Sequence, residues 1–312
     1  MPTEYMSDFM PTTLPCPPAA VLALADSAEQ RYRVYPLMSG SKRRWIEAPD
    51  QELKTAQRWL LDQWLYQLAP TDAAHGFVPG RSIVSNAARH VGCAWVVTAD
   101  LRNFFPSIGA SRVAQVLTEF EQPADVTAAL VRLVTRRQRL PQGAPTSPQL
   151  ANLVARRLDL RLLGWARRSG WNYTRYADDL TFSGAGNPRP LLEALKQIVR
   201  DEGFTLAPGK THMMSHHQRQ VVTGMVVNER VALPKPHRRL LRAMLYRLET
   251  MGVDKVDPQQ LQVVQGHLAL AHFVDPARFE AECRALATLL REASSSLPAT
   301  ASSSFVPAVT KT

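Results

Sequence analysis

The chain has 312 residues, enough to bury a substantial core, and a stretch of this size usually forms one large domain or two closely packed subdomains. Its 37 Lys and Arg against 27 Asp and Glu give a net charge of +10, which favours a polyanionic partner such as nucleic acid. No stretch approaches about 18 uninterrupted apolar residues, which excludes a membrane-spanning helix and membrane partners.

The N-terminal segment and the cysteines indicate a soluble protein. Residues 1–20 are rich in Pro and Thr and carry no Lys or Arg, so we expect a flexible segment and no signal peptide. The cysteines lie far apart without a CxxC pair, which argues against a zinc ribbon and a disulfide framework. They suit a reducing compartment, and the cytoplasm is the expected location. The cysteines are Cys16, Cys93 and Cys283.

The pattern of apolar residues predicts an α+β fold. Residues 52–68 have helical spacing that ends at Pro70. Residues 95–101 form a short β-branched run, and residues 172–183 have the character of two strand halves around an acidic centre. A β-rich segment with a glycine break covers residues 220–227. Further helices are predicted over residues 147–165, 190–200, 236–251 and 261–273.

Acidic residues stand at the ends of the predicted strands. Asp100 ends the first strand, and Asp178 and Asp179 occupy the turn of the later hairpin. A single Asp at a strand end often only caps a turn. Two adjacent like charges repel, and a fold normally tolerates them where a cation compensates. The three residues therefore predict a site for paired Mg²⁺ ions, which phosphoryl transfer by a polymerase requires.

The hairpin and its surroundings resemble reverse transcriptases of the bacterial retron type. Tyr176-Ala177-Asp178-Asp179, followed by Leu180 to Ser183, is similar to the catalytic hairpin of that family. Other family segments appear in order and at suitable spacing, and the resemblance covers about residues 30–275. These segments are RWIEAP at 44–49, HGFVPGRS at 75–82, DLRNFFPSI at 100–108, LPQGAPTSP at 140–148, and 203–211 from Gly-Phe to Lys-Thr.

The resemblance implies a right-hand polymerase with fingers, a palm of antiparallel sheet plus helices, and a short helical thumb. Residues 21–230 would form the fingers and palm and residues 231–293 the thumb. Residues 294–312, rich in Ser and Pro, are expected to be a disordered tail. From the length after the palm we expect neither a nuclease nor a long effector domain.

The family motifs imply a role for each matching residue. Asp100 and Asp178 would ligate both metals, and Asp179 would complete the acidic cluster. Phe105 resembles the aromatic steric gate that collides with a 2′-OH and so favours dNTPs. Cations beside the triphosphate would offset the charge of the leaving pyrophosphate, and a lysine would protonate it. The other implied nucleotide-binding residues are Gln142 and Gly143 in a proline-flanked turn, the cations Lys42, Arg44 and Arg81, which are candidates for the triphosphate or the template backbone, and the proton donor Lys210.

Two shorter elements favour the retron subfamily. Asn86 and His90 match its NAxxH element, and helical spacing would place both on one face, where they could grip the same RNA feature. Val222, Thr223 and Gly224 match its VTG element. A basic helix downstream is expected to follow a phosphate backbone. Its residues include Arg238, Arg239 and Arg242.

The resemblance implies the following partners: a cognate non-coding RNA as template, its cDNA, dNTPs and a separate effector protein in anti-phage defence. Priming from a 2′-OH would give a branched RNA–DNA hybrid. One alternative is another bacterial reverse transcriptase, either similar to group II intron proteins or of another defence-associated type. A second is an inactive RNA-binding scaffold with a polymerase shape, which the intact carboxylates and gate residue disfavour.

Overall fold

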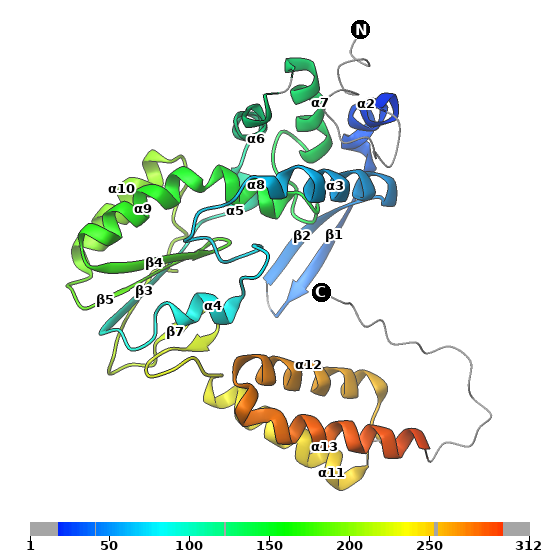
Figure 1. Cartoon of the computed structure of the whole chain (residues 1–312), viewed down its shortest axis with the longest axis vertical. Helices are drawn as coiled ribbons and strands as arrows, with labels where there is room; N and C mark the ends of the chain where they lie inside the picture. Colours follow the sequence, from blue (N-terminus) through cyan, green and yellow to red (C-terminus); the bar gives the residue numbers. More distant parts are fainter. Residues whose placement is uncertain (1–17, 41, 122, 253–254, 296–312) are drawn as a thin grey trace. The chain divides into compact units, whose positions relative to one another are not determined.

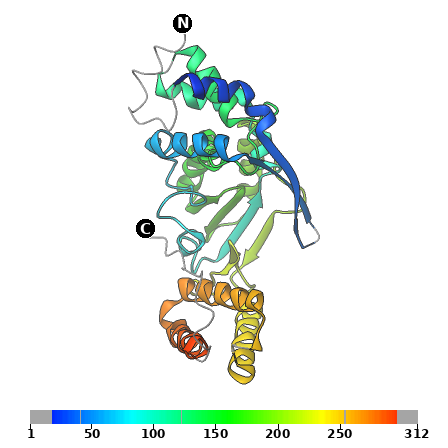
Figure 2. The same ribbon diagram turned by 90° about the vertical axis from the view of Figure 1, so that its right-hand side faces the viewer.

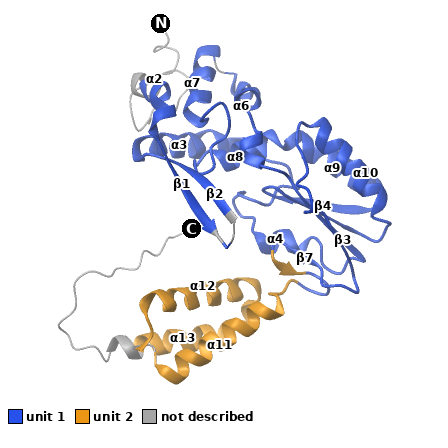
Figure 3. Ribbon diagram, turned by 180° about the vertical axis from the view of Figure 1, so that it is seen from behind, with its two compact units in different colours: residues 1–223, 227–230 blue, residues 224–226, 231–312 orange. Residues whose placement is uncertain are grey.

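The structure, a computed structural model, describes residues 18–40, 42–121, 123–252 and 255–295. It has helices and antiparallel sheets, so the predicted α+β class is confirmed. The chain divides into two compact units (Figure 3). Unit 1 comprises residues 1–223 and 227–230, and unit 2 comprises residues 224–226 and 231–312. None of the described helices is long and apolar enough to cross a membrane.

The centre of unit 1 is a four-stranded antiparallel sheet with the strand order β4-β5-β3-β6. Its strands are β3 (Trp95–Asp100), β4 (Trp171–Tyr176), β5 (Asp179–Gly184) and β6 (His212–Ser215). The register pairs Val97 with Phe182, and Phe182 with Tyr173, so alternate residues of the three strands share one face. Tyr173 and Phe182 stack with their ring centroids 4.7 Å apart.

Helices cover both faces of this sheet (Figure 1). On one side lie α9 (Arg156–Arg168) and α10 (Arg189–Asp201), which bury Leu158 and Leu195. On the other side lies the short helix α4 (Ile83–Ala88). Ser82 starts α4 with a reciprocal capping box, because the Ser82 and Ser85 side chains each bond the other's backbone N–H.

A two-stranded hairpin and further helices complete unit 1 (Figure 2). The hairpin pairs β1 (Tyr32–Ser39) with β2 (Lys42–Pro49). Asp50 caps the following helix by accepting a hydrogen bond from Leu53 N. The remaining elements are α2 (Pro18–Ser27), η1 (Ala28–Arg31), α3 (Gln51–Gln63), η2 (Leu65–Gln67), α5 (Phe104–Ser107), α6 (Ala110–Leu117), η3 (Thr118–Phe120), α7 (Ala124–Val134), α8 (Ser147–Val154) and β7 (Val221–Val222).

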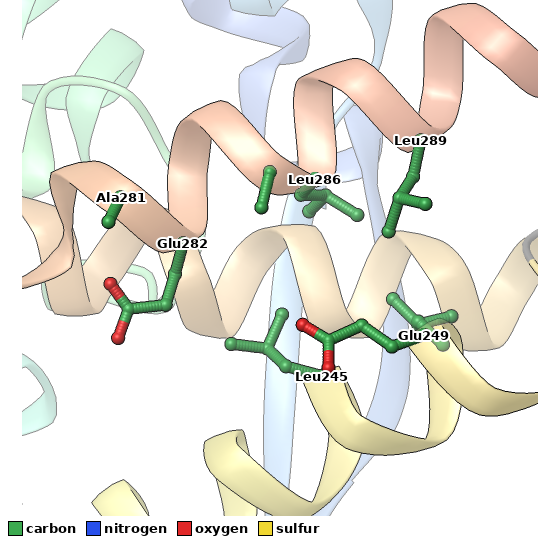
Figure 4. Close-up of a pocket in the computed structure, with 8 residues that line it drawn as sticks. Leu245, Glu249, Ala281, Glu282, Leu286 and Leu289 are labelled. Carbon is green, nitrogen blue, oxygen red and sulfur yellow. The ribbon is translucent and has the colours of Figure 1, made fainter.

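Unit 2 contains three long helices and the short strand β8 (Met225–Val226). The helices are α11 (Lys235–Met251), α12 (Pro258–Val274) and α13 (Pro276–Ser295). Leu241, Leu248 and Leu268 are among their buried residues. A small cavity of about 210 Å³ lies between α11 and α13 and is lined mainly by leucine and alanine side chains (Figure 4).

The structure corrects several predicted boundaries, among them the start of α12, which begins at Pro258 and not at residue 261. The helix predicted over residues 52–68 ends at Gln63, because Trp64 leaves the helical conformation with φ −122° and ψ −60°. The helix predicted over residues 147–165 is divided at Ala155, between α8 and α9. Helix α2 begins at Pro18, inside the segment predicted to be flexible. Residues 1–17 and 296–312 lie outside the described residues.

Candidate active site

Three carboxylates meet at one end of the central sheet. Asp100, the last residue of β3, pairs in register with Asp179, the first residue of β5. Directly opposed residues of an antiparallel pair have Cβ atoms about 4.5–5.5 Å apart. Asp178 lies in the turn just before β5, and its carbonyl accepts a hydrogen bond of 2.9 Å from Leu101 N. The structure thus brings the three predicted residues, remote along the chain, into one acidic cluster.

The cluster concentrates negative charge, which opposes ionisation. Desolvation, followed by the charges of Asp178 and Asp100, raises the pKa of Asp179 to about 6. Desolvation and the charge of Asp100 also raise the pKa of Asp178, while Lys210 and Arg44 lower it. A bound cation would relieve this repulsion, so the arrangement is suited to a divalent ion.

Lys210 is the cation that contacts the cluster directly. Its Nζ lies 2.6 Å from Oδ2 of Asp100. Among residues 18–295, in the parts that the structure describes, no three His, Cys, Asp or Glu side chains enclose an ion position. Mg²⁺ does not need such a cage, because it keeps several waters and usually takes one or two carboxylates plus substrate phosphates. Asp100 and Asp178 fit that donor set, and an ion would compete with Lys210.

The predicted nucleotide loop packs on strand β2. Glu47 N donates a 2.9 Å hydrogen bond to the carbonyl of Gln142. Gly143 adopts φ +142°, and a Cβ there would lie 2.8 Å from the carbonyl oxygen of Glu47, so glycine is required. Arg44 belongs to the same strand, and its charge reaches Asp178. Gln142 and Gly143 are thus held against β2, the strand that also carries Arg44.

An aromatic group borders the acidic cluster. Phe105 lies on α5, five residues after Asp100, and is half-buried. Its ring centroid is 6.1 Å from that of Phe77 and 5.6 Å from that of Phe104. Phe77 in turn is 6.4 Å from Tyr176, which ends β4. Phe105 is therefore near the end of the sheet where the gate is predicted, and its gating role stays a prediction.

Sequence reasoning missed a buried ion pair that supports the turn of Ala177 and Asp178, the predicted catalytic turn. Arg175 and Asp159 are both fully buried and form two hydrogen bonds, Nε to Oδ1 at 2.8 Å and Nη2 to Oδ2 at 2.7 Å. Arg175 Nη1 also donates to Asn152 Oδ1 at 2.9 Å and to the carbonyl of Ala177 at 3.1 Å. Ala177 has a positive φ of 56°, a strained conformation for a residue with a Cβ. Arg175 thus ties the strained turn to helix α9.

The placement of Asn86 and His90 gives no support to their predicted contact with RNA, which stays a prediction. Both side chains are fully buried. His90 Nδ1 lies 2.8 Å from Ser183 Oγ, and its Nε2 lies 2.7 Å from Thr174 Oγ1. Burial is the main cause that lowers the pKa of His90 to about 3, so the ring is neutral at physiological pH. His90 therefore fastens the end of α4 to strands β4 and β5.

The VTG element contacts the same helix. Thr223 Oγ1 donates a 3.0 Å hydrogen bond to the carbonyl of Ile83, the first residue of α4. Val222 is fully buried, so its side chain is enclosed by the protein and its RNA contact stays a prediction. Gly224 adopts φ +81° and is exposed. The two elements that mark the subfamily thus meet at α4.

Arg81 is used inside the protein. Its Nη1 donates to the carbonyls of Thr71, Asp72 and Ala74, and its Nη2 pairs with Asp72 at 3.3 Å. These bonds engage the guanidinium that was predicted to bind a triphosphate, so the structure favours a role in holding the loop before α4.

The predicted RNA-binding arginines of unit 2 lie on α11. Arg239 and Arg242 are exposed, and Arg238 is partly buried. Arg238 and Arg242 line one cavity together with Arg278 from α13. Their contact with RNA stays a prediction.

Comparison with known proteins defines the family. The family model described as reverse transcriptase (RNA-dependent DNA polymerase) matches residues 36–227. Two retron reverse transcriptases of Myxococcus xanthus are similar: Mx65 is 41% identical over 80% of this chain, and Mx162 is 38% identical over 78%. The matches span 64% and 57% of those relatives' lengths. Retron Ec86 reverse transcriptase of Escherichia coli is 34% identical, with 71% of each chain covered.

Solved structures give the same fold. A foamy viral protease-reverse transcriptase in complex with double-stranded DNA superposes with a TM-score of 0.50 at 16% identity, covering 84% of this chain and 39% of that one. The telomerase of Candida tropicalis in complex with a fragment of telomeric RNA also gives 0.50 at 10% identity, covering 85% and 55%. With the acidic hairpin in place and 192 residues matched by the family model, from 36 to 227, the chain belongs to the reverse transcriptase family, and within it to the retron type.

Proposed function

We propose that this protein is an RNA-directed DNA polymerase that copies a cognate structured non-coding RNA into DNA. The observation that carries the proposal is the meeting of Asp100, Asp178 and Asp179 at one end of a sheet. Desolvation, together with the mutual repulsion of the carboxylates, raises the pKa of Asp178 and of Asp179, and a divalent ion would relieve that repulsion.

The residues around the cluster have distinct tasks in this proposal. Asp100 and Asp178 would hold two Mg²⁺ ions, which would activate the attacking hydroxyl and stabilise charge on the leaving oxygen. Gln142 and Gly143 would pack on the nucleotide, since glycine lets the backbone approach closely. Lys210 pairs with Asp100. In the reaction its ammonium group would leave Asp100, contact the pyrophosphate and donate a proton to it.

Selection of the nucleotide sugar would depend on Phe105, and attraction of the triphosphate would depend on Arg44. The Phe105 ring would leave no room for a 2′-OH, so dNTPs would be preferred over rNTPs. Arg44 already lowers the pKa of Asp178 and would attract the triphosphate through the same field.

The RNA partner would be recognised by the basic helix of unit 2. Arg238, Arg239 and Arg242 would bind phosphates of a folded stem. As in the retron reading of the sequence, synthesis would begin at a 2′-OH of that RNA and yield a branched hybrid. A separate effector would link the product to anti-phage defence.

Primer extension tests the polymerase proposal. We expect the purified protein to extend a DNA primer on an RNA template with dNTPs and Mg²⁺. The double variant Asp178→Asn with Asp179→Asn should lose more than about a thousandfold in rate while melting no lower than the wild type. Asp62→Asn, an exposed carboxylate on α3, is the matched control and should extend normally. Extension by the double variant at the wild-type rate would overturn the site.

The branched product needs a separate test. We expect nucleic acid that copurifies from the native host to contain an abundant short DNA joined to one RNA species. Treatment with an enzyme that cleaves 2′–5′ linkages should separate the two strands. Random cellular RNA alone would reject the retron product and leave the polymerase assignment standing.

A further inference from the structure

Phe77 is an exposed aromatic residue with a strained backbone beside the acidic cluster. It has φ +62°, a region that residues with bulky side chains rarely adopt, and its side chain is 45% exposed. Such strain persists only where the surroundings impose it. Exposure removes the usual reason for keeping a phenylalanine, which is burial in a core.

The neighbours of Phe77 impose this conformation. A Cβ on Gly76 would lie 2.5 Å from Ala177 N, so the chain passes directly against the catalytic turn. The carbonyl of Gly76 accepts a 2.9 Å hydrogen bond from Asn152 Nδ2, and Asn152 is itself bonded to Arg175. The peptide that carries Phe77 is therefore fixed by the same buried residues that fix the turn before Asp178.

The ring of Phe77 lies close to two aromatic side chains of the candidate site. Its centroid lies 6.1 Å from Phe105 on α5 and 6.4 Å from Tyr176 at the end of β4. Phe104 contacts Phe105 at 5.6 Å and is buried. Phe105 thus has one aromatic neighbour fixed in the core and another, Phe77, at the solvent-facing edge.

We infer that Phe77 is a specificity-determining residue, which holds the Phe105 ring in the position that excludes a ribonucleotide sugar. This inference rests on the proposed function and on the gate role of Phe105. A gate discriminates only if its ring cannot yield to a hydroxyl, and α5, with four residues, gives little rigidity of its own. An aromatic pair contributes about 0.5–1.5 kcal/mol, which corresponds to a change of up to roughly tenfold in discrimination.

Single-nucleotide incorporation with matched dNTPs and rNTPs tests the inference. We expect Phe77→Ala to lower the ratio of kcat/KM for dNTP over rNTP by up to about tenfold, mainly by improving rNTP use. Phe77→Leu, which keeps more volume, should have a smaller effect. Phe105→Ala serves as the reference with the larger loss, and Phe273→Ala, an exposed aromatic on α12, should leave the ratio unchanged.

The outcomes separate the inference from the proposal beneath it. If Phe105→Ala relaxes selection and both Phe77 variants keep the wild-type ratio, the inference fails and the gate stands. If the Phe77 variants lose dNTP and rNTP incorporation equally, Phe77 only supports folding, and the inference is overturned. If Phe105→Ala also leaves the ratio unchanged, the proposed gate fails. Melting curves for each variant identify any loss of folded protein. If Phe77→Ala does not fold, the ratio measured for Phe77→Leu decides the test.

Discussion

Two groups of polar residues lie on the same face of the central sheet and have opposite electrostatic character. At one end, β3 and β5 pair Asp100 with Asp179, which are like charges. Farther along that face, Thr174 and Ser183 flank His90, a neutral ring with both nitrogens within hydrogen-bonding distance of a hydroxyl. The first group places like charges side by side, and Lys210 offsets only part of their repulsion, whereas the second group is complete within the protein.

The difference teaches how to separate a binding site from a structural one. Both groups come from motifs that mark the family, so the motifs alone do not distinguish them. Burial distinguishes the two groups, because the acidic end is open to solvent at Asp179 whereas His90 is fully enclosed. A polar group that has all its partners inside the fold has nothing left to offer a ligand.

Removing Arg175 should have the largest effect on stability. The Arg175→Met variant would leave Asp159 as a buried charge without its partner, which costs about 3–5 kcal/mol of the free energy of unfolding. Urea denaturation measures this loss. The double variant with Asp159→Leu should recover part of it, because no charge then remains buried. A single variant as stable as wild type would show that the pair contributes nothing.

His90 should make the stability depend on acid. The pKa of His90 is about 3 in the folded protein and 6.5 in the unfolded chain. Below pH 6.5 the unfolded chain therefore binds a proton that the folded protein does not bind. Stability should therefore fall by about 2 kcal/mol between pH 7 and pH 5 through this residue. His90→Gln keeps a donor and an acceptor and should lack this component. Parallel pH slopes for the two proteins would contradict the buried, neutral ring.

The acidic end of the sheet could be predicted from the sequence because two of its three carboxylates are adjacent in the chain. Asp178 and Asp179 are adjacent like charges that repel each other, and this indicates a cation site in the sequence alone. The β-branched run before Asp100 predicts the partner strand. The helices that flank the sheet also follow from apolar spacing, as for α10 and α11, which match their predicted ranges to within one residue.

The supporting residues could not be predicted, because their roles depend on contacts between distant segments. Arg175 looks like an ordinary exposed cation until α9 places Asp159 beside it. Asn86 and His90 share a helical spacing that suits an exposed face equally well, and only the packing of α4 on the sheet buries them. The strain at Phe77 has no sequence signal, since it arises from the approach of Gly76 to the catalytic turn.

Asp179 should give the smallest effect and one of opposite sign to that of His90. Its pKa of about 6 exceeds the ordinary 3.8, so as the pH rises from 3.8 to 6 the unfolded chain ionises first and the folded state loses stability. Asp179→Asn should therefore be more stable than wild type above pH 6 and equal to it below pH 3.8. Because Asp179 is exposed and screened by solvent, we expect a gain of only about 1 kcal/mol.

The same variant tests whether a cation compensates the acidic end. Denaturation without divalent metal, repeated with added Mg²⁺, should show the wild type gaining more stability than Asp179→Asn, because the ion binds the folded cluster and relieves its repulsion. Asp62→Asn on α3 should follow the wild type in both conditions. Equal stability of wild type and Asp179→Asn at pH 8 without metal would mean that charge repulsion at the acidic end destabilises the folded protein no more than the buried group around His90 does.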